Sequence, residues 1–170
     1  IGIPLGVLLY STAKDGLHPN VAVYNVLSLI VNIFRSIPFL ILLILILPIT
    51  KILVGSTIGA KAVIPPLVFS ASPYIARMVE SSLKEVDLGV IEAAKSMGAT
   101  NLQIIIKVLL SESKPSLLIG AAISITTILG YSAMAGAVGG GGLGDVAIRY
   151  GYYRYNQDVM LITVVLLVII

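Results

Sequence analysis

The sequence has no cysteine and a single histidine, His18. Disulfide frameworks, thiol nucleophiles and the usual zinc sites built from clustered cysteine and histidine are therefore excluded. Charged residues are also scarce, at 11% of the 170 positions, and the net charge of +3 is spread without a basic run. That pattern argues against nucleic-acid binding. With no serine, histidine and carboxylate set, we expect no catalytic residue, no metal site and no cofactor bound by this chain.

Hydrophobic residues make up 58% of the chain, and the mean hydropathy is +1.06. Both values lie outside the range of ordinary soluble domains. Since helices satisfy their own backbone polar groups in lipid, the composition predicts an all-α, multi-pass membrane protein. Both ends of the sequence fall inside apolar runs. We therefore interpret residues 1–170 as a single transmembrane domain cut from a longer polypeptide.

A helix needs roughly 20 apolar residues to cross the hydrocarbon core of a bilayer. By this measure we expect about five transmembrane helices. Their positions are residues 1–10 as the tail of a span, 37–54 as the clearest span, 58–79, 116–135, and a last span that starts near 159. Residues 21–34 differ, because polar side chains recur there at three- and four-residue spacing. This stripe predicts either a helix lying in the membrane interface or a helix facing others in the bundle. Its polar members are Asn25, Ser28 and Asn32, followed by Arg35.

The span at 58–79 contains Pro65, Pro66 and Pro73, each of which removes a backbone hydrogen-bond donor. Broken helices at membrane depth occur where they pack inside protein or line a cavity, so Pro73 is a candidate for a translocation path. An ordinary kinked helix fits the same residues. Ser132 and Met134 are further candidates for the path, although a methionine among small apolar residues usually serves packing.

Arg77 and Glu80 lie one helical turn apart at the end of the same span. Their spacing predicts a structural ion pair, and a place on the translocation path is the alternative. Near the other end of the chain, Arg149 and Arg154 lie among four tyrosines. The aromatic cluster fits an interfacial belt or a contact for another protein, and the belt is the favoured interpretation. Its tyrosines are Tyr150, Tyr152, Tyr153 and Tyr155.

Residues 82–114 form a long polar interruption that looks folded. Asp87 can cap a helix that ends near Gly98, and Thr100 with Gln103 forms a capping box that opens a second helix through Leu110. Positive charge gathers in this loop, which places it in the cytoplasm. The lysines are Lys84, Lys95, Lys107 and Lys114, with Lys14 and Arg35 assigned to the same side.

The first helix of this hairpin offers a surface for another protein. Glu92 and Lys95 can pair at i,i+3, and Ala93 and Ala94 leave a flat patch that allows close approach. A solvated hairpin without a partner fits these features equally well.

Two stretches of the loop carry a family resemblance. Glu92-Ala93-Ala94-Lys95-Ser96-Met97-Gly98-Ala99, followed by Ile105-Ile106-Lys107-Val108-Leu109-Leu110, resembles the EAA loop of binding-protein-dependent importer permeases, which belong to ATP-binding-cassette (ABC) transporters. A proline normally follows the final leucine in that family, and Ser111 stands in its place. Within the family, the chain is similar to the methionine importer permeases at residues 31–39, 75–80 and 130–139.

The resemblance implies a permease subunit, not an enzyme, in the bacterial cytoplasmic membrane. It implies a homodimer of this chain and two ATPase subunits that hold ATP and Mg. It also implies an external binding protein that delivers methionine, in the D or L form, or a related small amino acid. The ATPase-docking and coupling residues implied are Glu92, Ala93, Ala94, Lys95 and Gly98.

Gly139 to Gly144 formally contain the G-x-G-x-x-G pattern of nucleotide-binding turns. No strand precedes it and no phosphate-cradling Gly-Lys-Ser or Gly-Lys-Thr follows, so we interpret it as an external turn. The alternative function is an ion-coupled secondary transporter or channel, which requires ionisable residues at mid-membrane. Only Lys61 and Arg77 come close to that requirement. An intramembrane enzyme lacks any nucleophile or metal ligand.

Overall fold

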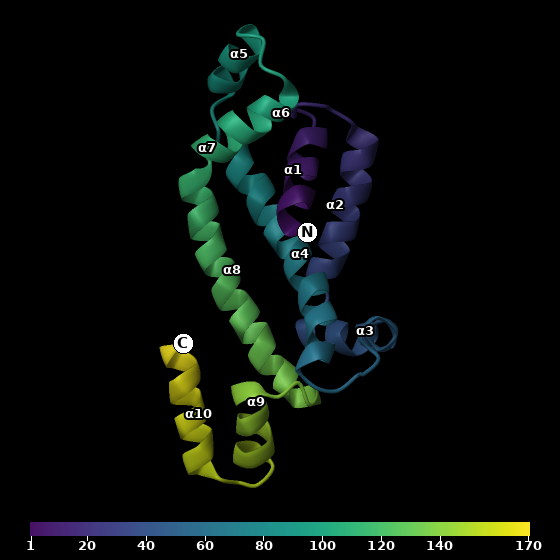
Figure 1. The fold of residues 1–170 in the computed structure, drawn as a ribbon, viewed down its shortest axis with the longest axis vertical. Helices are drawn as coiled ribbons and strands as arrows, with labels where there is room; N and C mark the ends of the chain where they lie inside the picture. Colours follow the sequence, from purple (N-terminus) through teal and green to yellow (C-terminus); the bar gives the residue numbers. More distant parts are fainter. The chain divides into compact units, whose positions relative to one another are not determined.

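The computed structural model describes residues 1–170 and is entirely helical, as predicted (Figure 1). Most elements are α-helices, and two short π-helices (η1 and η3) and one 3₁₀-helix (η2) interrupt them. The elements are α1 (Gly2–Thr12), α2 (Val21–Ser36), α3 (Phe39–Val54), α4 (Ala60–Lys84), α5 (Leu88–Ser96), α6 (Asn101–Gln103), η1 (Ile104–Leu109), α7 (Leu110–Glu112), α8 (Lys114–Ala135), η2 (Gly136–Val138), α9 (Gly142–Val146), η3 (Ala147–Tyr152) and α10 (Gln157–Ile169).

The chain divides into two compact units, which are described separately. Unit one contains Ile1–Ser36 and Ala71–Ile125, and unit two contains Ile37–Ser70 and Thr126–Ile170. The two long helices α4 and α8 contribute residues to both units.

Two helical segments are long and apolar enough to cross a membrane, Ala60–Lys84 and Lys114–Val138, each of 25 residues. A third span results if α2 and α3 count as one, although the chain bends by 110° between them. The helix expected at 37–54 is present as α3, but its 16 residues extend only about 24 Å, against a hydrocarbon core of about 30 Å. The segments expected at 1–10 and from 159 are the shorter apolar helices α1 and α10.

The expected break at the prolines of α4 does not occur. One helix continues from Ala60 to Lys84 through Pro65, Pro66 and Pro73, all of which are buried. The helix therefore continues although each of these prolines lacks a backbone N–H.

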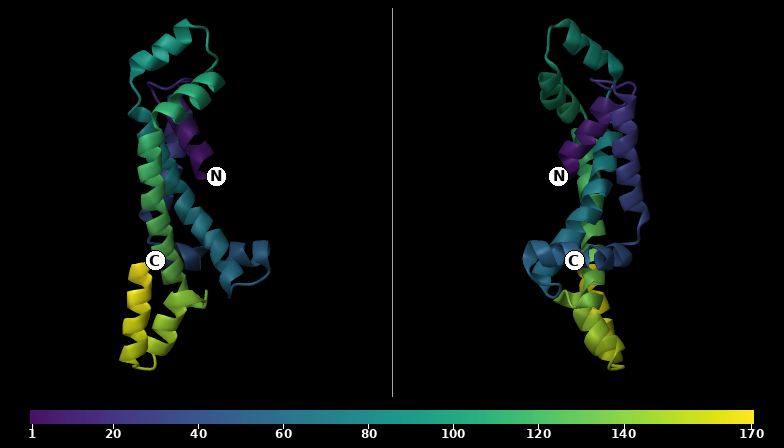
Figure 2. Two further views of the ribbon diagram at one scale, coloured as in Figure 1. Left: turned by 60° about the vertical axis from the view of Figure 1, so that its left-hand side comes forward. Right: turned by 90° about the vertical axis from the view of Figure 1, so that its right-hand side faces the viewer.

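Unit one packs α1 and α2 against α4 (Figure 2). The small residues of α1 allow this approach, because a Cβ placed on Gly6 would meet the Ala76 carbonyl and the Val79 side chain. A larger buried cluster joins α1, the α1–α2 loop, α4, α5 and η1. Its members are Tyr10, Leu17, Val79, Leu83, Val86, Ile91, Ala94, Ile104 and Leu109.

Unit two has its own core of Phe39, Leu43, Val63 and Ala135. The Phe39 ring stacks on Tyr131, with 4.7 Å between ring centroids. Glycines let α9 pack directly against the end of α8, since a Cβ at Gly144 would collide with the Ala133 carbonyl. Unit two therefore combines a core of large apolar side chains with close backbone packing at its glycines.

Candidate functional site

The first arm of the polar hairpin begins and ends where the sequence predicts. The Asp87 carboxylate accepts the Gly89 N–H at 2.6 Å and caps α5. At the other end, the Gly98 N–H donates to the Lys95 carbonyl at 2.9 Å and the Ala99 N–H donates to the Ala94 carbonyl at 3.1 Å. These bonds form a Schellman motif, which requires the left-handed φ of +80° seen at Gly98.

The second arm opens with the predicted capping box. The Gln103 N–H donates to the Thr100 hydroxyl at 3.4 Å, and the Thr100 N–H donates to the Gln103 side-chain oxygen at 2.9 Å. The predicted single helix is instead α6, the π-helix η1 and α7 in succession. In a π-helix the backbone hydrogen bonds join residues five apart instead of four, which widens the turn, and such segments often lie at functional sites.

Ser113 and Pro115 form the exit of the hairpin, where the resemblance calls for a proline at position 111. The Ser113 hydroxyl donates to the Leu109 carbonyl at 2.6 Å, and Ser111 is exposed. Pro115 lies in the first turn of α8, where a missing N–H costs nothing. The chain therefore starts its next long helix without a proline at Ser111.

The predicted docking residues do not all reach the surface. Glu92, Ala93 and Lys95 are exposed, whereas Ala94 is 4% exposed and packs in the large core cluster with Ile91. The flat patch expected from two alanines is therefore carried by Ala93 alone. Glu92 and Lys95 are not among the ion pairs of the structure, which are Arg77–Glu80, Lys84–Glu80 and Arg149–Asp145.

The sequence patterns described above did not predict that the hairpin carries exposed apolar side chains. Met97, next to the turn, is 81% exposed, and others stand on both arms. Their exposure could be predicted, because they fall between the buried positions of each arm. The other members of this exposed rim are Leu88, Val90, Leu102 and Ile106. Together with Ala93, the rim gives the hairpin a surface suited to another protein.

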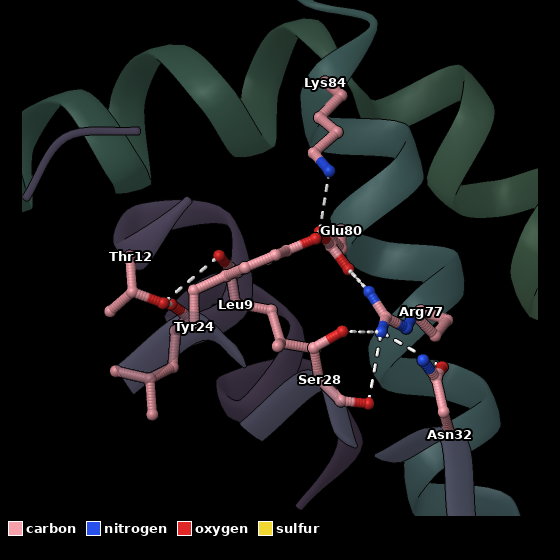
Figure 3. A network of polar contacts seen from close by, with 9 residues as sticks. Leu9, Thr12, Tyr24, Ser28, Asn32, Arg77, Glu80 and Lys84 are labelled. Carbon is pink, nitrogen blue, oxygen red and sulfur yellow. Dashed lines mark hydrogen bonds and ion pairs between the residues drawn. The ribbon is translucent and has the colours of Figure 1, made fainter. Parts of the chain in front are cut away.

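A buried polar network lies below the hairpin, with the Glu80 carboxylate at its centre (Figure 3). Glu80 has a side chain only 3% exposed, and it pairs with Arg77 at 2.6 Å and with Lys84 at 2.7 Å. The Tyr24 hydroxyl donates to the same carboxylate at 3.0 Å. The predicted ion pair of Arg77 and Glu80 is therefore present, and a second cation shares it.

The same network decides how α2 is used. The Arg77 guanidinium donates to the Ser28 hydroxyl, to the Ser28 carbonyl at 3.3 Å and to the Asn32 side-chain oxygen at 3.0 Å. Part of the polar stripe of α2 thus faces another helix, as one of the two interpretations proposed. Tyr24 contacts Glu80 and Asn32 contacts Arg77, so α2 runs antiparallel to α4. Arg35 therefore lies at the end of α2 away from the hairpin, which corrects its assignment to the hairpin side.

The residues considered for a translocation path fall in different units. Pro73 is buried in unit one, and Ser132 and Met134 belong to unit two. In unit two, Ser132 lines a groove of about 670 Å³, whereas Met134 is 47% exposed and is not among the lining residues. The groove is lined by Thr126, Leu129, Gly130, Ser132, Ala133, Gly141, Gly142, Leu143, Gly144, Leu167, Val168 and Ile170.

The glycine-rich segment forms a turn, as predicted. Gly139, Gly141 and Gly142 all have positive φ, and α9 begins at Gly142. The tyrosine cluster that follows is exposed, and the Arg154 guanidinium lies 4.7 Å from the Tyr150 ring centroid. No group of three or more histidine, cysteine or acidic side chains is arranged to hold a metal ion.

Comparisons with known proteins agree with this arrangement over the whole chain. Residues 2–170 match the family described as binding-protein-dependent transport system inner membrane component. The probable D-methionine transport system permease protein MetI of Vibrio cholerae is 54% identical over 170 residues, 100% of this chain and 76% of that protein. The methionine import system permease protein MetP of Bacillus subtilis is 51% identical over 163 residues, 96% of this chain and 73% of that protein.

A solved structure gives the same result in three dimensions. A chain of the MetNI methionine ABC transporter in an inward-facing conformation is 53% identical, with a TM-score of 0.97. The match covers 99% of this chain and 78% of the solved one. The chain therefore belongs to the family of binding-protein-dependent transport system inner membrane components.

Proposed function

We propose that the chain is the permease subunit of an ATP-driven importer of methionine in the bacterial cytoplasmic membrane. The observation that carries this proposal is the likeness to methionine permeases along the full chain, at 54% identity to one relative and a TM-score of 0.97 to a solved transporter chain. The folded hairpin between α4 and α8 supports it, because such a hairpin gives an ATPase a surface to push against. The chain itself is a permease and not an enzyme.

ATP and Mg belong to a partner, since the sequence has no phosphate-cradling loop of its own. Two ATPase subunits dock on the hairpins of two copies of this chain, and each meets Glu92, Ala93 and Lys95 on α5. Gly98 fixes the turn, and Ala94 acts from beneath, by holding α5 on the core cluster. The exposed apolar rim around Met97 supports this assignment, because it would otherwise stand in water.

An external binding protein delivers the substrate, in keeping with the description of the family. The substrate then passes along a path to which Ser132, Met134 and Pro73 contribute. Ser132 has the strongest support, because it lines the groove of unit two. A groove of about 670 Å³ has room for a single amino acid.

Uptake into proteoliposomes tests the proposal. Labelled methionine should accumulate only when the permease, the ATPase subunit, ATP and the binding protein are all present. Competition by a panel of unlabelled amino acids, including both D- and L-methionine, then defines the substrate. Uptake driven by an ion gradient without ATP would overturn the proposal in favour of a secondary transporter.

A further inference from the structure

The loop between α1 and α2 is tightly folded. The Gly16 N–H donates to the Ala13 carbonyl at 2.9 Å, and the His18 N–H donates to the Ser11 carbonyl at 2.8 Å. Gly16 lies so close to the end of α1 that a Cβ there would overlap the Tyr10 and Ser11 carbonyls. The Asn20 side chain then caps α2 by accepting the Val23 N–H at 3.1 Å. This loop is thus fixed to both of its helices.

The same loop contacts the hairpin formed by α5, α6, η1 and α7, which we call the docking hairpin. Leu17 is 9% exposed and belongs to the buried cluster that contains Ile91 and Ala94 of α5 and Ile104 of η1. Beside it, the His18 Nε2 atom lies 2.6 Å from the Asn101 side-chain nitrogen, within hydrogen-bond distance. Asn101 is the first residue of the second arm, directly after the Thr100 cap. The hairpin is therefore held at a point remote in sequence as well as at its own two ends.

This contact gives the hairpin a direct connection to α1 and α2. It adds to the packing of α5 and η1 against Tyr10 of α1 and against Val79 and Leu83 of α4 in the same buried cluster. The polar network adds a further contact between helices, because the Tyr24 hydroxyl of α2 donates to the Glu80 carboxylate of α4. The helices and the hairpin of this part of unit one are therefore cross-linked on several sides.

We propose that the α1–α2 loop is a clamp that makes the docking hairpin, α1, α2 and the adjoining end of α4 move as one body during transport. Leu17 and His18 are its positioning residues, since neither belongs to the surface that meets the ATPase. The proposal rests on the proposed function, because it assumes that the hairpin receives the force of the ATPase. A passive packing contact is the competing explanation, and it predicts lost stability without lost coupling.

The first experiment measures methionine transported per ATP hydrolysed by the complete transporter in proteoliposomes. Leu17→Ala should lower this ratio at least threefold while the ATPase rate stays within about twofold of wild type, since one buried leucine truncation commonly loosens its surroundings. Leu43→Ala is the matched control, because Leu43 is also buried, at 2% exposed against 9% for Leu17, but lies in the core of unit two. It should leave the ratio unchanged.

His18 provides a variant that spares the core. His18→Ala should lower the ratio, and His18→Gln, which keeps a side chain able to hydrogen-bond to Asn101, should restore it. An unchanged ratio in both Leu17→Ala and His18→Ala would overturn the clamp. Failure of the proposed function is separate from this result, because it would abolish ATP-dependent methionine uptake in the wild type as well.

The second experiment tests whether the clamp stays closed. Since the chain has no cysteine, a His18→Cys and Asn101→Cys double variant can be joined by a short, reducible bis-methanethiosulfonate reagent. The reagent should join the two positions and leave methionine uptake within about twofold of that of the untreated double variant. Failure to join them, or loss of uptake that a reductant restores, would show that the loop and hairpin separate during the cycle and would overturn the proposal.

Discussion

At Gly98 the constraint comes from the backbone alone. Its φ is +80°, yet no atom lies within 4 Å of the position a Cβ would occupy. Gly98→Val should therefore cost about 1–2 kcal/mol through strain without any collision, because β-branched residues are rarely left-handed. We expect methionine uptake to fall about tenfold with normal membrane insertion, since the strain opens the turn next to the docking face. Uptake assays and immunoblots of membrane fractions measure the two effects.

Gly98→Asn is the matched control, because asparagine adopts left-handed backbone far more readily than valine. It should retain most of the uptake. Normal uptake by Gly98→Val would contradict the coupling role assigned to this turn.

Glu80 is a residue whose removal leaves charges without a partner. Its side chain is 3% exposed and forms ion pairs with both Arg77 and Lys84. Glu80→Gln should lower the free energy of unfolding by about 2–4 kcal/mol, because the Arg77 guanidinium, whose side chain is 19% exposed, loses its counter-ion. Lys84→Ala should cost under about 1 kcal/mol, because the Lys84 side chain is 49% exposed and Arg77 still pairs with Glu80. Titration of the purified permease with SDS measures both values, and equal losses would argue against a central role for Glu80.

Single residues were predictable where their effect is local. The Asp87 cap, the Gly98 turn and the Thr100 capping box each involve bonds within a few residues, so sequence spacing suffices to find them. The burial of Ala94 was not predictable in this way. It depends on partners such as Leu17, which stand far away in sequence.

At the scale of elements, a polar stripe leaves its environment undefined. The pattern in α2 fits water, headgroups or another helix equally well, and only the guanidinium of Arg77 on α4 decides between them. The π-helix η1 was also beyond prediction, since the sequence of residues 104–109 reads as ordinary helix. For α2, contacts between elements settle what the local pattern leaves open.

The packing of α9 against α8 leads to a prediction at the same scale. Gly144→Ala should lower the free energy of unfolding by about 1–3 kcal/mol, because the added methyl group collides with the Ala133 backbone and pushes the helices apart. Gly130→Ala is the control within α8, since open space surrounds a Cβ there. It should be neutral or stabilise by up to about 1 kcal/mol through helix propensity. Equal destabilisation by both variants would contradict the close contact.

At the scale of the whole molecule, apolar runs predicted which segments are helical but not where each helix ends or changes direction. The run at 37–54 is the most continuous in the sequence, yet it forms the 16-residue helix α3 beyond a 110° bend from α2. The bend falls at Ile37 and Pro38, where proline disfavours helical backbone in the residue before it. Hydropathy measures the preference of a segment for lipid and carries no information on such a change of direction.

Because the chain has no cysteine of its own, its orientation in the membrane can be tested with single introduced cysteines. Met97 of the hairpin is 81% exposed and Tyr155, before α10, is 91% exposed, so a single cysteine at either place should react readily. In intact spheroplasts that express the permease without an ATPase, a membrane-impermeant maleimide should label Tyr155→Cys. Met97→Cys should be labelled only after the membrane is permeabilised, because the lysines of the hairpin hold it in the cytoplasm. The unmodified chain is the control, and labelling of Met97→Cys in intact spheroplasts would place the hairpin outside and remove it from reach of any cytoplasmic ATPase.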